Sequence, residues 1–157
     1  LSKSPVMKLS ILIVCEVLLP YQASIYFKDL EKKPNVEGFP VYHYKGQPFT
    51  GTTIDSAHYE QKVIHHHVQN GLIQKQLGWD YQGNLVRSFE YKNGILHGRV
   101  LLFFSNGQKY LEENYQNGMI EGEAFGWYQD GSRRFIAEYF GGVEISRYEY
   151  PKPEPKD

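Results

Sequence analysis

Hydrophobic and polar residues alternate in short runs from Tyr44 to about Tyr150, and glycine-containing turn sequences separate the runs. The runs are rich in β-branched and aromatic side chains, as in Arg99 to Phe104 and Gln108 to Tyr115. No stretch of this region keeps the 3.6-residue spacing of an amphipathic helix. The pattern predicts an all-β fold in which consecutive strands pair antiparallel as a meander of hairpins.

The runs recur with a period of 23 to 24 residues. Equivalent positions are Tyr44, Val68, Tyr91, Tyr115 and Tyr139. One unit begins Tyr-Lys-Asn-Gly-Ile-Leu-His-Gly and the next begins Tyr-Gln-Asn-Gly-Met-Ile-Glu-Gly. A repeat of this length is one supersecondary unit that stacks on its neighbours. The sequence therefore predicts an elongated, twisted, single-layer sheet with hairpin units at 44–67, 68–90, 91–114 and 115–138 and a partial unit at 139–150.

Asn-Gly and Asp-Gly pairs mark the turns, because both central positions of a type I′ turn need positive φ. Five pairs carry this signal: Asn70-Gly71, Asn93-Gly94, Asn106-Gly107, Asn117-Gly118 and Asp130-Gly131. A second glycine follows in several units, at Gly51, Gly98 and Gly122. We expect these glycines either to form a bulge or strand entry, or to make room for an aromatic ring of the adjacent unit.

The string from Tyr91 to Gly98, the aromatic pair Phe103-Phe104, then Asn106-Gly107 and the string from Tyr115 to Gly118 resemble the MORN-repeat variant of many bacterial proteins. The resemblance covers about two-thirds of the chain and implies stacked hairpins in one open sheet. It also implies a binding role, since members of this group are commonly labelled antitoxins of toxin–antitoxin pairs. Unit one has Glu60-Gln61 where a turn glycine is expected, and unit two has Lys75 in place of its second glycine, which suggests an irregular capping hairpin.

Composition narrows the class of partner. The chain has 157 residues and a formal net charge of −1, so there is no electrostatic case for binding a nucleic-acid backbone. Aromatic residues make up 15% of the chain, which suits pleated sheet surfaces. A single cysteine excludes an intramolecular disulfide framework.

The two ends differ from the repeat. Residues 1–24 contain a basic residue, an apolar run from Leu9 to Leu19 and a small-residue site at Ala23, which is typical of an export signal. The alternative is that this run covers one face of the sheet as a buried strand or helix. If this export signal is real, the protein belongs in the periplasm or cell envelope. Without it, the protein belongs in the cytoplasm. Residues 25–43 form a lead-in, with a linker or short helix expected from Phe27 to Gly38, and the proline-rich tail 151–157 is expected to be extended and disordered.

Candidate catalytic and metal-binding side chains have ordinary explanations. In a strand only His65 and His67 of the triple histidine could share a metal, and no acid or cysteine lies at a suitable spacing from them. Glu112 and Glu113 are adjacent and point to opposite faces. Glu121 and Glu123 could share a face, but solvated carboxylates beside a turn are the usual case. We expect no catalytic, cofactor-binding or metal-binding residues, and hence no enzyme.

The surface of the sheet is the remaining candidate for function. A face of about nine short strands would offer roughly 850 Å², comparable to one partner's share of a protein–protein interface. The candidate partner-binding residues are Trp79, Tyr81, Phe103, Phe104, Trp127 and Tyr128. The competing interpretation is that these aromatic rings only pack across strands to hold a thin sheet together.

The sequence thus favours a non-catalytic module that binds a protein, with neutralisation of a cognate toxin as the sharpest version. An exported structural or surface protein of the cell envelope is the alternative, and contact with a membrane stays open without support. The open ends of the sheet could also pair between copies of the chain.

Overall fold

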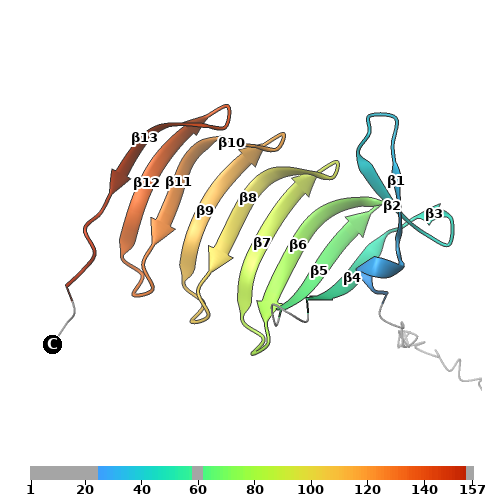
Figure 1. Cartoon of the computed structure of the whole chain (residues 1–157), viewed down its shortest axis with the longest axis horizontal. Coiled ribbons are helices and arrows are strands. Elements are labelled where there is room, and N and C mark those ends of the chain that lie inside the picture. The colour runs from blue at the N-terminus through green and yellow to red at the C-terminus, as the bar shows by residue number, and fades with distance from the viewer. Residues whose placement is uncertain (1–24, 58–61, 155–157) are drawn as a thin grey trace, which may run out of the picture.

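A computed structural model describes residues 25–57 and 62–154 and confirms the all-β prediction. The main sheet is antiparallel and follows chain order from one end to the other (Figure 1). Its strands are β4 (Gly51–Ala57), β5 (Lys62–Gln69), β6 (Leu72–Asp80), β7 (Leu85–Lys92), β8 (Ile95–Phe103), β9 (Lys109–Gln116), β10 (Met119–Ile120), β11 (Gly122–Trp127), β12 (Arg133–Phe140) and β13 (Val143–Glu149). The short strand β10 and the longer β11 both pair with β9. Consecutive hairpins therefore make one open meander.

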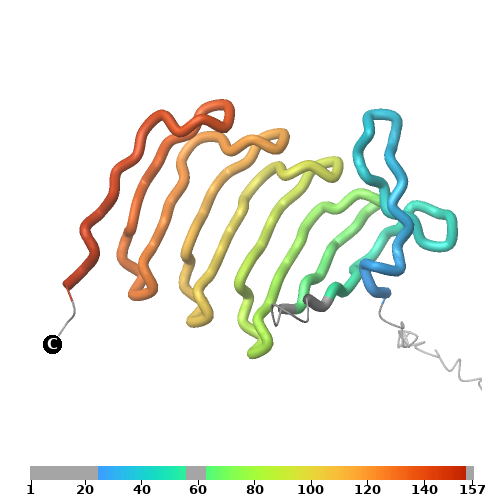
Figure 2. The backbone as a smooth tube through the Cα atoms, viewed as in Figure 1, coloured from blue at the N-terminus to red at the C-terminus, as the bar shows by residue number. Residues whose placement is uncertain are grey.

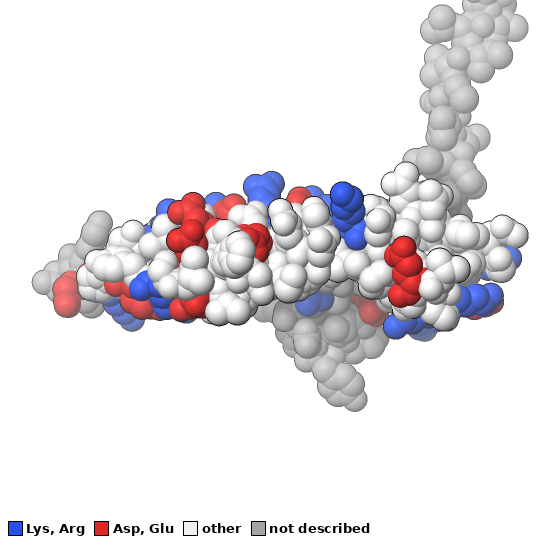
Figure 3. Space-filling model, turned by 90° about the horizontal axis from the view of Figure 1, so that it is seen from above, with Lys and Arg blue, Asp and Glu red and all other residues white. Residues whose placement is uncertain are grey.

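The main sheet is a single layer that twists along its length (Figure 2). Viewed from above, the molecule is a thin slab in which acidic and basic side chains are interspersed (Figure 3). The part of the chain that the structure describes contains no helix long and apolar enough to cross a membrane. The export-signal prediction lies in residues 1–24, outside the described residues.

Two kinds of turn alternate along the sheet, one kind on each of its long edges. At the edge that we call the asparagine-turn edge, both central residues have positive φ, as type I′ turns require. These turns are Asn70-Gly71, Asn93-Gly94, Asn117-Gly118 and Gly141-Gly142. The prediction is confirmed for the three Asn-Gly pairs of this edge.

The opposite edge, the bulge-turn edge, corrects the prediction for the other two pairs. Asn106 and Asp130 do not have positive φ, whereas Gly107 and Gly131 do, at 83° and 86°. The N–H of Gly107 donates to the carbonyl of Phe104 at 2.9 Å, and Phe104 N–H donates to the carbonyl of Gln108 at 2.9 Å. This is a three-residue loop, a type I turn followed by a left-handed glycine, rather than a two-residue type I′ turn. The Asn-Gly pair therefore occurs in both kinds of turn, and the two differ in loop length and in the φ of the asparagine.

Turns of the asparagine-turn edge are hydrogen-bonded to the preceding unit. The N–H of Gly118 donates to the carbonyl of Leu96 at 2.8 Å, and that of Gly142 donates to the carbonyl of Ile120 at 3.0 Å. A side chain of the preceding unit faces the first turn residue: the pairs are Asn70 N–H with Thr50 Oγ1, Asn117 N–H with His97 Nδ1, and Gly141 N–H with Glu121 Oε2. The recurring position occupied by His97 and Glu121 is therefore part of the turn stack.

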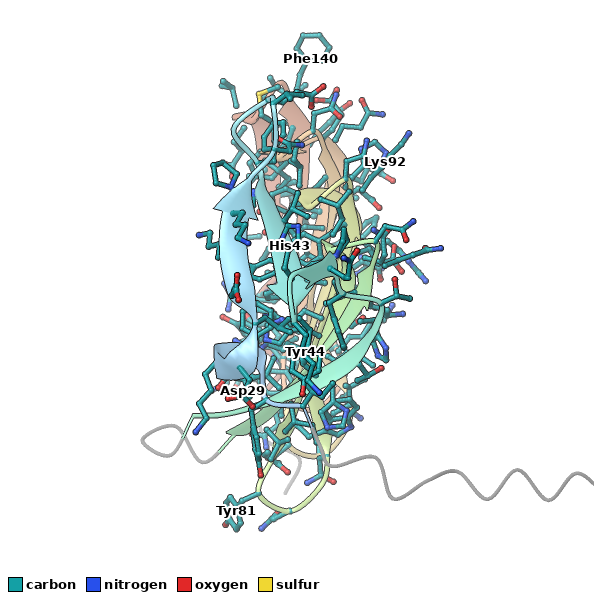
Figure 4. All side chains as sticks on the ribbon, turned by 90° about the vertical axis from the view of Figure 1, so that its right-hand side faces the viewer. Asp29, His43, Tyr44, Tyr81, Lys92 and Phe140 are labelled. Carbon is teal, nitrogen blue, oxygen red and sulfur yellow. The ribbon has the colours of Figure 1, made fainter. Side chains whose placement is uncertain are left out.

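A second, smaller sheet covers one face of the main sheet near β4 to β6 (Figures 1 and 4). It consists of β1 (Glu31–Pro34), β2 (Pro40–Tyr44) and β3 (Gln47–Pro48), and a 3-10 turn, η1 (Phe27–Asp29), precedes it. The expectation of a linker or short helix from Phe27 to Gly38 is therefore wrong for Glu31–Pro34, which form an edge strand after the 3-10 turn. Leu30 and Phe49 from this segment are buried against Val68 of β5. We call the face of the main sheet on which the small sheet packs the covered face, and the opposite face of the main sheet the open face.

Small residues let the covered face stay thin beyond the small sheet. Ala124, Phe135 and Ala137 are buried there with no second layer among the described residues, and Leu111 and Tyr139 pack beside them. The Phe135 ring lies against Gly126, where a Cβ atom would overlap it. The expectation that Gly51, Gly98 and Gly122 make room for an aromatic ring of the adjacent unit is wrong. Phe49, two residues away in the chain, lies at Gly51, the Glu90 side chain lies at Gly98, and a Cβ atom at Gly122 would meet no described side chain within 4 Å.

Replacing Gly118 by Val should destabilise the fold by about 1–3 kcal/mol, because φ is +84° there and a β-branched residue strongly disfavours that region. The matched control is Gly118→Asn, which should cost less because asparagine tolerates the left-handed region. Urea unfolding of the two variants measures the difference. Equal midpoints for Gly118→Val and wild type would contradict the turn assignment.

His66 should make the fold sensitive to acid. Its side chain is buried on the covered face beneath the Phe27 ring, 3.9 Å between centroids. Burial lowers its pKa to about 4, aided by Arg87, His65 and His67 and opposed by Asp55. The unfolded chain binds a proton near pH 6.5 and the folded chain does not until about pH 4, so stability should fall as the pH drops through this window.

The loss should be on the order of 2–3 kcal/mol between pH 7 and pH 4. His66→Phe keeps an aromatic ring against Phe27 and removes the titrating group, so the difference between its unfolding free energy and that of the wild type isolates the effect. Parallel pH profiles for the two proteins would show that His66 is not buried as described.

Candidate functional site

The open face carries a continuous row of side chains across the sheet. Cross-strand partners define it from the middle of β4 to near the end of β13: Ile54, His65, Leu77, Ser88, Leu101, Glu112, Phe125, Ile136 and Tyr148. Among the described residues no second layer packs on this face, in contrast to the covered face. Apart from the buried Ser88, its side chains are therefore the ones available to a partner.

An aromatic row runs beside this one, toward the bulge-turn edge. Trp79 of β6, Phe103 of β8 and Trp127 of β11 are each 24 residues apart and occur on every second strand. Strands lie about 4.8 Å apart, so neighbouring rings of the row are separated by roughly 10 Å. Three of the six predicted partner-binding residues thus lie in one line on one face.

The strands between them contribute a second series with the same period. Leu85 pairs with Trp79, Lys109 pairs with Phe103, and Arg133 pairs with Trp127. A β-bulge accompanies each of these pairs, so the equivalent residue of each unit is placed in the same way.

The two cations of this series are held against aromatic rings. Lys109 Nζ lies 4.6 Å from the Trp127 ring centroid and 2.7 Å from Glu112 Oε2. The Arg133 guanidinium lies 4.6 Å from the Phe125 centroid and 4.9 Å from that of Trp127. These contacts are cation–π interactions, which fix both the rings and the charges in one orientation. Trp127 therefore packs across strands, as the competing interpretation expected, while no second layer among the described residues covers the row.

The other three predicted residues lie outside the row. Phe104 and Tyr128 begin equivalent loops of the bulge-turn edge. Tyr81 lies within the preceding loop, is 72% exposed and projects from the end of the strands (Figure 4). Asp80 takes the position equivalent to Phe104 there, and its carboxylate accepts hydrogen bonds from Asn84 and Gln82 that lower its pKa.

A groove of about 450 Å³ opens at the bulge-turn edge beside Trp127. Its walls come from two adjacent loops, from the strands that leave them, and from the C-terminal segment: Phe104, Tyr110, Trp127, Tyr128, Gln129, Asp130, Arg134, Lys152 and Pro153. Phe104 and Tyr110 meet edge to face with centroids 5.1 Å apart, and Arg134 lies 5.7 Å from the Tyr110 centroid. The groove is thus aromatic, with Arg134, Lys152 and Asp130 as the charged groups in its walls, and its size suits part of a peptide or a small ligand.

Hydrogen bonds hold the groove's walls together. Asn106 Nδ2 donates to the carbonyl of Gln129 in the next loop at 3.1 Å. The N–H of Tyr150 donates to the Arg134 carbonyl at 2.7 Å, and Tyr128 Oη donates to the Tyr150 carbonyl at 3.3 Å. These bonds position the residues that follow Tyr150 along the groove. Residues 151–154 have no regular secondary structure and are exposed.

A polar row runs along the open face on the side of the asparagine-turn edge. Lys75 of β6 lies 4.0 Å from Glu90 of β7. Glu123 and Glu138 are direct cross-strand partners, and like charges in such positions repel each other. The open face is therefore divided lengthwise into an acidic and mixed-charge strip and an aromatic strip.

The histidine and glutamate candidates occupy separate places. His65 lies against Trp79 with ring centroids 4.5 Å apart, and His67 Nδ1 lies 3.0 Å from Thr52 Oγ1. His66 is on the other face, as the strand alternation predicts. Glu121 accepts a hydrogen bond from the N–H of Gly141 instead of approaching Glu123. Within the described ranges, no three histidine, cysteine or acidic side chains are grouped so that they could hold a metal ion.

Sequence reasoning missed Lys109, Arg133, Tyr110 and Arg134. A signal was present, because 85, 109 and 133 share the unit period, as do 86, 110 and 134. The bulges that turn these residues toward the row and the groove left no mark of their own in the sequence.

No protein-family model matches the chain, and no curated protein matches it. The resemblance to MORN repeats therefore stays a prediction that rests on the turn and aromatic motifs.

Proposed function

We propose that this protein is a non-catalytic binding module that uses the aromatic row and the adjacent groove to bind another protein. The observation that carries the proposal is the line of Trp79, Phe103 and Trp127 on a face without a second layer among the described residues. Trp, Tyr and Arg are the residue types that contribute most to protein–protein binding when a partner covers them. Here all three types lie side by side, since Arg133 contacts Trp127 and Arg134 contacts Tyr110.

Rigidity also supports a binding role. Within the row, Trp127 is held by Lys109 and Arg133 and Trp79 lies against His65, and the groove is fastened by a hydrogen bond between loops. A surface that is already ordered loses little conformational entropy on binding, so more of the contact energy appears as affinity. The basic groups beside the rings favour a partner whose contact surface is acidic and apolar.

The sharpest version of the proposal is neutralisation of a toxic protein, as the labels of MORN-like proteins suggest. It rests on the resemblance of the repeat alone. An extended sheet face could cover an active site or block an assembly surface without any chemistry of its own.

The proposal is tested with a tagged full-length chain in the organism that encodes it. Wild type should capture a stoichiometric protein, and purified partner should then bind with an affinity that Trp127→Ala and Phe103→Ala each weaken at least about tenfold, the range typical of anchor residues. Quantitative mass spectrometry of the captured protein and isothermal titration measure the two effects.

Tyr81→Ala is the matched control, because it removes an aromatic ring that lies outside the row and is 72% exposed. It should leave the affinity unchanged. Circular dichroism checks that each variant keeps the β fold. A partner whose affinity is insensitive to Trp127 and Phe103 but falls with Tyr81→Ala would contradict the proposed surface, and the absence of any stoichiometric partner would contradict the function.

A further inference from the structure

The outer edges of the two terminal strands of the main sheet, β4 and β13, differ in how far the chain covers them. At the β4 end the N–H of Ile54 donates to the carbonyl of Ile25 at 3.0 Å, and Tyr26 forms a parallel bridge to Ile54. The small sheet packs beside this end as well. The middle of the β4 edge is thus occupied by the chain itself, which acts as a cap at this end of the repeat array.

The β13 end has no such cover among the described residues. All seven residues of β13 are exposed, and within the described part of the chain its strand partner is β12 alone. Six of the eleven exposed large apolar residues of the described ranges lie at this end: Met119, Phe140, Val143, Ile145, Tyr148 and Tyr150. An exposed apolar edge strand is a template for pairing with another strand.

The hydrogen bonds to β12 show which backbone groups of β13 point outward. Tyr150 N–H donates to the Arg134 carbonyl, and the same register pairs Tyr148 with Ile136 and Ser146 with Glu138. In an antiparallel strand, alternate residues direct their N–H and C=O groups to opposite sides. The backbone N–H and C=O groups of Tyr150, Tyr148 and Ser146 therefore point toward β12. Those of Arg147 and Glu149 point to solvent.

We propose that β13 pairs antiparallel with β13 of a second copy, with the two-fold axis at Tyr148. Arg147 then lies opposite Glu149 of the second copy, and Glu149 lies opposite its Arg147. Each of these two pairs exchanges two backbone hydrogen bonds and brings opposite charges together on the covered face. The two Tyr148 rings meet on the open face, and Ser146 lies opposite Tyr150.

Neighbouring registers are less favourable. An axis at Arg147 or at Glu149 places two identical charges directly opposite each other, which is destabilising. The bulge between Glu138 and Tyr139 interrupts the strand pairing before Ser146, and Pro151 lacks an N–H to extend it. The regular segment from Ser146 to Tyr150 is the part that remains, and it is complementary to itself in the proposed register.

The covered β4 end limits the assembly to two chains. A head-to-tail array would need β13 of one copy to pair with β4 of the next, where the Ile25 segment already lies. A two-fold contact between identical edges is closed after one pairing. The dimer would join two open faces into one longer surface, yet it needs no partner protein, so its failure would leave the proposed function untouched.

Sedimentation equilibrium of the full chain, from about 5 to about 500 μM protomer, tests the proposal. A reversible monomer–dimer equilibrium is expected. Glu149→Pro removes one outward N–H but no bond to β12, so it should abolish the dimer while the circular dichroism spectrum is unchanged. Arg147→Glu should weaken association at least about tenfold.

The charge-swapped double variant R147E/E149R should restore association to within about threefold of wild type, since the complementary pairs are re-formed. Lys92→Glu, an exposed charge change on β7, is the matched control and should have no effect. A monomer at every concentration, or a dimer that Glu149→Pro and Arg147→Glu leave intact, would overturn the proposal. Association that continues beyond two chains would overturn it too.

Discussion

Everything in this structure depends on the backbone ladder of one sheet that has no second layer along most of its described length. A side chain on such a sheet can be buried only by its cross-strand neighbours, so each unit relies on the units beside it. The turns keep the neighbours in register: Gly118 bonds to Leu96 and Gly142 to Ile120, each one unit back in the chain. Rings packed on Gly126 and cations packed on Trp127 supply the burial that a second layer provides elsewhere.

The same constraint determines which surfaces of the described chain are covered and which are open. The chain covers one face near its N-terminal end, where Phe27 lies on His66 and Leu30 lies in the core. The opposite face carries the aromatic row, and the last strand forms an exposed edge of the sheet. A thin sheet of this kind offers surface in proportion to its number of repeats.

The sequence predicted the sheet because each repeat contains residue types, such as asparagine and glycine, that favour particular backbone conformations. The Asn-Gly pairs at the type I′ turns predicted the unit length and the strand order. The 24-residue spacing of Trp79, Phe103 and Trp127 predicted half of the candidate site. It could not separate Asn106-Gly107 from Asn93-Gly94, since the same pair serves a three-residue loop in one place and a two-residue loop in the other. Nor did it show the strand at Glu31–Pro34, where charged side chains pair along an edge without an alternating pattern. The groove could not be predicted from the sequence, because it depends on where the C-terminal segment lies. A hydrogen bond between Tyr128 and Tyr150, which are separated in the chain, sets that position.

The central claim is that a protein partner contacts the open face. Site-specific photocrosslinking in the native cell tests it directly, with a benzoylphenylalanine placed at Phe103 on the open face or at Phe89 on the covered face. The two positions lie on adjacent strands and are both half-buried aromatic residues, so they differ mainly in the direction in which they point. The account predicts one crosslinked protein from position 103 and none from position 89. Crosslinking to the same protein from position 89 alone would show that the partner contacts the covered face and would contradict the account.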